Sequence, residues 1–226
     1  MTRPPMIDQP LATANPSLTE RLIQTDACIA EGCEWLARAE PRFARALDLT
    51  GTIPLRRRPD GFDQLLQAIV SQQVSVASAR AIWGRLEAAG MTTPEAILST
   101  DIEGLRALGL SRQKATYAQA LAGAGIDFDA LRHAPTEDVV ATLTAVKGIG
   151  VWTAEIYAMF SLGRADVFAP GDLALQESAR LLFDLDERPK ERAFREMAEP
   201  WRPWRAVAAR ALWAYYHVAK QREGIA

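Results

Sequence analysis

Hydrophobic residues recur along most of the chain three and four positions apart, which is the spacing of one face of an α-helix. The clearest run comprises Phe62, Leu65, Leu66, Ile69 and Val70. No segment shows the sustained alternation of apolar and polar residues that a half-buried strand would produce. The pattern therefore predicts an all-α fold.

Capping residues, glycines and prolines divide this pattern into individual helices. Ser17 or Thr19 is expected to cap a first long helix that continues to about Ala39 and ends before Pro41. Asp60 should open the apolar helix described above. Later caps are expected at Ser75, Thr93, Thr100, Ser111 and Thr136.

The segments between and beyond these helices have a different composition. Residues 1–16 contain four prolines and no periodicity, which indicates a disordered or loosely packed arm. Residues 50–59 combine two prolines with three consecutive arginines and are expected to be a connector. Two further helical patterns occupy residues near 173–184 and 204–221.

The most distinctive stretch is a glycine-rich turn between two predicted helices, at Lys147-Gly148-Ile149-Gly150. Glycines two positions apart permit a left-handed backbone and let a large partner approach without a Cβ in the way. The first N–H groups of the helix that follows lack intrahelical partners and point outward at the positive end of the helix dipole. Such a terminus can bind a phosphate.

A tight helix–helix turn that binds nothing is the alternative interpretation of this stretch. Lys147 before the turn and Thr153 after it add a cation and a hydroxyl group. Because both groups suit an anion, we favour a phosphate-binding turn.

Residues 148–154 resemble the hairpin of the helix-hairpin-helix DNA glycosylases, and residues 167–172 resemble the segment that carries the catalytic aspartate of that superfamily. The hairpin alone is shared by many DNA-binding proteins, whereas the hairpin, the aspartate and a Gln-Gln segment together are specific. The alkylation-repair branch, of the 3-methyladenine DNA glycosylase II type, also matches at residues 68–75, 105–111, 201–205 and 212–213.

The resemblance implies two helical lobes with a cleft between them. Residues 1–58 would form an N-terminal arm and a helix that joins the C-terminal lobe. Residues 59–165 would form a central helical lobe that ends in the hairpin, and residues 166–226 the C-terminal lobe with the catalytic aspartate. The chain is expected to lack the N-terminal sheet domain of larger relatives.

The resemblance also assigns chemical roles. Asp172 would stabilise the positive charge that develops on the sugar when the N-glycosidic bond breaks, although an aspartate before a helix is commonly only a cap. Trp152 stands where bifunctional relatives carry a nucleophilic lysine, which implies a monofunctional hydrolase that leaves an abasic site. Trp152 and Trp213 would form the walls of the base pocket, while Trp35, Trp83, Trp201 and Trp204 are assigned to the core.

Other family positions concern DNA and a cation. Gln73 aligns with the side chain that fills the hole left by a flipped base, with Gln72 beside it, unless both merely start a helix. Ala214 replaces a tyrosine of the best-matched relatives, which implies a more open pocket. A Na⁺ or K⁺ ion would bind the backbone carbonyls of Thr144, Val146 and Ile149.

Composition narrows the partners and cofactors. The net charge is −2, but residues 188–222 hold nine basic and three acidic side chains, which could attract DNA or simply form a solvated helix surface. Cys28 and Cys33 are too few for an iron–sulfur cluster, and two histidines do not suggest a zinc site. No segment resembles a membrane span or a secretion signal, so a cytoplasmic monomer that requires no cofactor is expected.

Three functions remain open on the sequence. The first is an N-glycosylase that flips alkylated bases such as 3-methyladenine and 7-methylguanine out of damaged double-stranded DNA and hydrolytically excises them, in base excision repair. The second is a glycosylase of the same fold for oxidised or mismatched bases. The third is a non-catalytic module that uses the hairpin only to hold DNA.

Overall fold

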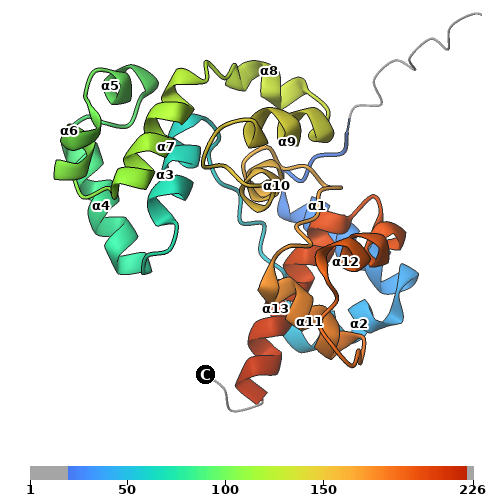
Figure 1. Ribbon diagram of the computed structural model, residues 1–226. Coiled ribbons are helices and arrows are strands. Elements are labelled where there is room, and N and C mark those ends of the chain that lie inside the picture. The colour runs from blue at the N-terminus through green and yellow to red at the C-terminus, as the bar shows by residue number, and fades with distance from the viewer. Residues whose placement is uncertain (1–19, 223–226) are drawn as a thin grey trace, which may run out of the picture.

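The computed structural model describes residues 20–222, and these form an all-α fold, as predicted. The helices gather into two groups (Figure 1). One group comprises α3 (Phe62–Ser71), α4 (Val76–Ala88), α5 (Pro94–Leu98), α6 (Ile102–Ala107), α7 (Arg112–Gly123), α8 (Phe128–His133), α9 (Thr136–Thr144) and α10 (Val151–Phe160). The other comprises α1 (Asp26–Ala39), α2 (Pro41–Thr50), α11 (Leu173–Leu182), α12 (Glu191–Met197), the 3₁₀ helix η1 (Glu199–Trp201) and α13 (Arg205–Arg222).

The second group is built around α13, against which α1, α2 and α11 pack. Small side chains on α13 let its neighbours approach closely, and Ala206, Ala208 and Ala209 are fully buried. The approach of α1 is so close that a Cβ on Gly32 would lie 2.7 Å from Val207 Cγ2. The N-terminal helices therefore pack with the C-terminal ones, although the residue limits of the three predicted segments stay a prediction.

An aromatic cluster fills the space beside α13. Trp201 lies at its centre, 5.1 Å from the ring of Phe43 and 5.6 Å from that of Phe168, both edge to face. Trp201 and Trp204 are buried, as predicted, and Trp35 packs partly buried against the core. Trp83 likewise packs partly buried against the core, and it also lines a cavity.

The two helix groups meet where the chain leaves α10. The backbone N–H of Ile23 donates to the Gly163 carbonyl at 2.7 Å, and Ala165 N–H donates to the Arg21 carbonyl at 3.0 Å. The buried Arg164 guanidinium donates to the carbonyls of Leu131, Arg132 and Ala134. These bonds tie the start of the described chain to the end of the first helix group.

Several helix starts agree with the sequence and others do not. Ser75, Thr93 and Ser111 cap α4, α5 and α7 through their side chains, as predicted. The first helix begins only at Asp26, with Thr25 as its cap, while Ser17 and Thr19 lie outside the described residues.

Three other predicted caps were wrong by one residue or by role. Gly61 rather than Asp60 precedes α3, because Asp60 pairs with Arg132 instead. Asp101 rather than Thr100 caps α6, by accepting from Gly104 N–H at 2.8 Å. Thr136 is the first residue of α9, and its own N–H is held by the Glu20 carboxylate at 2.8 Å. Helices α2, α8 and α12 were not predicted. Helices α8 and α12 are short, with six and seven residues, whereas α2 has ten residues and buries Phe43 and Ala46, so its apolar face was overlooked.

Candidate active site and DNA-binding hairpin

Asp172 lies at the start of α11, directly after the turn that leaves the buried segment 165–169. One of its carboxylate oxygens, Oδ1, accepts from the backbone N–H groups of Ala174 at 2.9 Å and Leu175 at 3.0 Å. Asp172 is therefore an N-cap, as the plainer interpretation of the sequence held. Its other oxygen, Oδ2, takes no part in capping.

Two tryptophans hold the same carboxylate from other helices. Trp152, in the first turn of α10, donates from Nε1 to Oδ2 of Asp172 at 3.0 Å. Trp213 of α13 donates from Nε1 to Oδ1 at 3.2 Å. Four N–H groups thus converge on one carboxylate and fix its orientation. The sequence placed both tryptophans near the base but did not indicate these hydrogen bonds.

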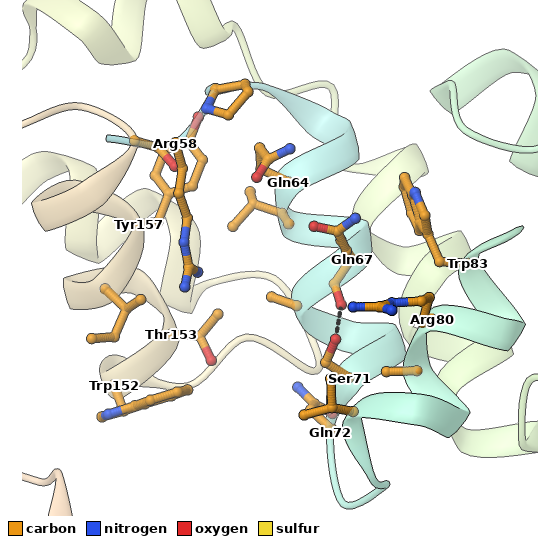
Figure 2. A pocket seen from close by; sticks show the side chains of 17 residues that line it. Arg58, Gln64, Gln67, Ser71, Gln72, Arg80, Trp83, Trp152, Thr153 and Tyr157 are labelled. Atoms are coloured by element: carbon orange, nitrogen blue, oxygen red, sulfur yellow. Dashed lines mark hydrogen bonds between the residues drawn. The ribbon is translucent and has the colours of Figure 1, made fainter. Parts of the chain in front are cut away.

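A cavity of about 740 Å³ opens beside Trp152, between α10 on one side and α3 and α4 on the other (Figure 2). Its walls are largely apolar, and Figure 2 shows Arg58, Gln64, Gln67 and Arg80 among the polar side chains around it. Of the two tryptophans predicted to form the walls of the base pocket, only Trp152 lines this cavity. Trp213 lines a separate, smaller pocket, and Asp172 does not line the large cavity. The indole of Trp152 therefore borders the cavity on one side and contacts the carboxylate on the other.

The hairpin has the strained geometry that its glycines suggest. Gly148 has φ = +100°, and an added Cβ would lie 2.3 Å from Cγ of the Tyr117 ring. Ile149 N–H donates to the Val146 carbonyl at 3.0 Å and closes the turn. Across the fold, the Gln72 amide Nε2 donates to the Gly148 carbonyl at 3.0 Å. Tyr117 was not singled out in the sequence, because nothing local marks it as the packing partner of the hairpin.

Most of the predicted DNA-contacting residues are accessible, but not all in the expected way. Lys147 and Gly150 are exposed, and no side chain caps the N–H groups that open α10. The Ile149 side chain is buried, so only its backbone can face a phosphate. Thr153 lines the cavity with its side chain (Figure 2).

The two glutamines differ in role. Gln72 is half-buried and holds the hairpin, as described above. Gln73 is exposed at the tip of the turn between α3 and α4, with φ = +53°. A left-handed backbone is uncommon for glutamine, and the exposed side chain is free to meet a partner. Gln73 therefore remains the candidate for insertion into DNA.

The predicted cation site consists of the carbonyls of Thr144, Val146 and Ile149, which belong to this turn. Backbone carbonyl oxygens suit a monovalent cation, and the Val146 oxygen keeps a second lone pair beyond the one that Ile149 N–H occupies. The donor chemistry is therefore compatible with Na⁺ or K⁺. Elsewhere within residues 20–222, no cluster of His, Cys, Asp or Glu side chains is arranged to hold a metal ion.

The basic stretch 188–222 is mostly neutralised by the protein itself. Arg205 contacts Asp166 and Glu199, and Arg202 contacts the same two acids. Arg195 reaches the buried Glu155, and Arg188 and Arg192 also pair with acids. Burial raises the pKa of Glu155, and Arg195 partly opposes this. Most arginines of this basic stretch therefore pair with acidic side chains of the protein itself.

Comparison with known proteins identifies the family. Residues 66–203 match the model of the HhH-GPD superfamily of base excision DNA repair proteins. The chain belongs to this superfamily. It is 30% identical to DNA-3-methyladenine glycosylase 1 of Schizosaccharomyces pombe over an alignment of 190 residues. The alignment covers 79% of this chain and 83% of the relative.

Two solved structures of the superfamily share the fold of this chain. A DNA-3-methyladenine glycosidase from Bacillus halodurans superimposes with a TM-score of 0.76 at 33% identity, over 84% of this chain and 91% of the other. The S. pombe glycosylase Mag1, solved in complex with abasic DNA, gives 0.69 at 29% identity, over 81% and 95%. The predicted helix-hairpin-helix glycosylase fold is thereby confirmed. No helix within residues 20–222 combines the length and apolar character needed to span a bilayer.

Proposed function

We propose that this chain excises alkylated bases from DNA as a monofunctional glycosylase, with Asp172 as its catalytic carboxylate. The chain is a DNA glycosylase of base excision repair, a hydrolase that acts on N-glycosyl bonds like its 3-methyladenine relatives. The observation that carries the assignment of Asp172 is its geometry: four N–H donors hold one carboxylate, and one of these donors, Trp152, also lines the open cavity.

The chemistry follows from the order of charge development. A flipped nucleotide places its base along the Trp152 ring and its sugar at Asp172. As the C1′–N bond breaks, positive charge builds on the sugar, and the fixed carboxylate stabilises that charge without having to reorient. Asp172 also orients the water that attacks C1′ and accepts its proton.

The residue at position 152 determines whether the DNA strand is cut after the base is released. It occupies the first turn of α10, where an amine would be needed to form a Schiff base with the sugar, and an indole cannot do this. The product is therefore an intact strand with an abasic site. A cationic alkylated purine stacks favourably on the same indole through cation–π attraction.

The hairpin binds the DNA backbone. The uncapped N–H groups at the start of α10 and the exposed Lys147 bind a backbone phosphate, while the Gln73 side chain enters the duplex. A Na⁺ or K⁺ ion bound by Thr144, Val146 and Ile149 would add positive charge at the same phosphate. These contacts read no sequence, as suits an enzyme that must search for damage.

The test is chromatographic identification of the bases released from methylated duplex DNA in a single turnover, for the wild type and for Asp172→Asn. Asparagine can still cap α11, so the fold and the DNA affinity should survive. Release should fall by about two orders of magnitude or more, the scale seen when one electrostatic stabiliser is removed. Release of oxidised bases instead, of no base at all, or wild-type rates in a folded variant would contradict the proposal.

A further inference from the structure

Arg58 is held at the mouth of the cavity by two contacts with Phe160. Its backbone N–H donates to the Phe160 carbonyl at 3.0 Å, and its guanidinium lies 5.4 Å from the centre of the Phe160 ring. Figure 2 shows the Arg58 side chain extending into the space between α10 and α3. The ring of Phe160 in turn packs against that of Trp213, 5.8 Å away. Arg58 is thus connected to Asp172 through the rings of Phe160 and Trp213.

The guanidinium has no acid to neutralise it in the part of the chain that the structure describes. The residues that line the cavity include Arg58 and Arg80 but no aspartate or glutamate, and no ion pair of Arg58 is found among residues 20–222. The buried Arg210 also lies against the Phe160 ring, 4.5 Å from the ring centre. Burial first, and then the nearby Arg57 and Arg56, lower the pKa of Arg210 to about 10. Arg58 and Arg80 therefore bring positive charge to the cavity that Trp152 borders, and Arg210 adds a further cation at Phe160.

That charge is poorly suited to a substrate base that is itself cationic. An alkylated purine with a positive charge departs as a neutral molecule and needs no donor. An uncharged purine departs with the electron pair of the broken bond and carries negative charge as it leaves. A hydrogen-bond donor aimed at that charge lowers the barrier, as in any site that stabilises a developing anion.

We propose that Arg58 is a further catalytic residue, which donates a hydrogen bond to the departing base and extends the activity to purines that are uncharged before excision. The inference rests on the proposed function, because it uses the same cavity and the same carboxylate. In this step the C1′–N9 bond breaks and both of its electrons remain on the base. The attacking water forms the new C1′–O bond and gives up a proton to Asp172. The base, held by Arg58, takes a proton from solvent.

The experiment compares two substrates in one variant. Arg58→Gln and the wild type are assayed in single turnover on a duplex containing one hypoxanthine, which is uncharged, and on a duplex containing 7-methylguanine, which is cationic. Release of hypoxanthine should fall by about a hundredfold or more, on the scale of a lost oxyanion donor. Release of 7-methylguanine should stay within about threefold of the wild type or rise, because a repelling charge has been removed.

Arg80→Gln is the matched control. It removes the same charge from the opposite wall of the cavity, on α4 (Figure 2). In Arg80→Gln, the ratio of the hypoxanthine release rate to the 7-methylguanine release rate should stay within about twofold of the wild-type ratio. An equal change of the ratio in both variants would show that Arg58 contributes only to a general field, and would overturn the proposal.

Other outcomes also separate the possibilities. Equal losses on both substrates in Arg58→Gln, with weaker DNA binding, would make Arg58 a phosphate contact and would overturn its catalytic role. A wild-type enzyme that releases 7-methylguanine but no hypoxanthine would also overturn the inference and would leave the proposed function intact. Release of neither base would instead contradict the proposed function.

Discussion

Trp213 donates a hydrogen bond from its indole Nε1 to Oδ1 of Asp172 at 3.2 Å, across the space between α13 and α11. Trp152 makes the corresponding bond to Oδ2 from α10. Both indoles therefore act on the carboxylate, and Trp152 also borders the cavity proposed for the base. These two effects can be separated, because phenylalanine keeps an aromatic ring but has no N–H group.

Trp213→Phe and Trp152→Phe should each lower single-turnover base release by roughly tenfold, the scale of one lost charge-assisted hydrogen bond. In an Asp172→Asn background, the same changes should have little further effect, because their partner carboxylate is already gone. The DNA dissociation constant should not change. If the losses multiply instead, the tryptophans act on the base alone.

The two hairpin glycines should respond differently to alanine. Gly150 has φ = −89° and open space around an added Cβ, so Gly150→Ala should leave the melting temperature unchanged. It should nevertheless weaken DNA binding, because the new methyl group meets the approaching phosphate. Gly148→Ala should lower the melting temperature through a left-handed backbone and a clash with Tyr117. A Gly150→Ala variant with wild-type affinity would place the phosphate elsewhere.

Lys147 should contribute to DNA affinity through charge alone. Binding to undamaged duplex should weaken steeply with salt, and Lys147→Ala should reduce the slope of log K against log salt by about one. The reduction should be the same for unrelated sequences. Titrations of two duplexes of different sequence at several salt concentrations measure it, and a sequence-dependent loss would mean that Lys147 reads bases.

Gln73→Ala should slow excision from duplex DNA more than from a single-stranded substrate. The reason is that only a stacked base pair leaves a hole that must be filled when the base flips. Val74→Ala truncates an exposed neighbour in the same turn and should affect both substrates little. Equal losses on the two substrates in Gln73→Ala would show that this residue only shapes the turn.

The two cysteines should differ in reactivity toward a thiol reagent. The hydrogen bond with the Thr25 side chain lowers the pKa of Cys28, whereas burial raises that of Cys33 to about 11. Only about one Cys33 thiol in a thousand is ionised at pH 8, and the thiolate is the reactive form. Labelling at pH 8 should therefore show a fast phase that Cys28→Ser removes, and the slow phase should accelerate toward pH 11. A fast phase that survives in Cys28→Ser would contradict this assignment.

The sequence predicted what depends on neighbouring residues. Ser75, Thr93 and Ser111 were found as caps because a cap is satisfied by N–H groups two or three residues away. The hairpin and the position of Asp172 were predicted because each lies in a short segment that resembles the family, and the segments follow one another in the family's order. Thr136 was misjudged because its N–H is satisfied by Glu20, far earlier in the chain.

The contacts that set the chemistry are long-range and could not be predicted in this way. The indoles of Trp152 and Trp213 reach Asp172 only once α10, α11 and α13 have taken their relative positions. The position of Arg58 depends on Phe160, about a hundred residues later in the chain. The sequence placed Arg58 only in a run of three arginines within a predicted connector. A residue in a basic run can be assigned a role only when its acidic partners, or their absence, are known.

The hydrogen bond from Gln72 to the Gly148 carbonyl has a consequence for how damage is located. It joins the turn that carries Gln73, which we propose to enter the base stack, to the hairpin, which we propose to hold the DNA backbone. The distance between the two is therefore fixed by the protein and does not adapt to each stretch of DNA. In this proposal, Gln73 inserts at a constant number of nucleotides from the phosphate that the hairpin holds.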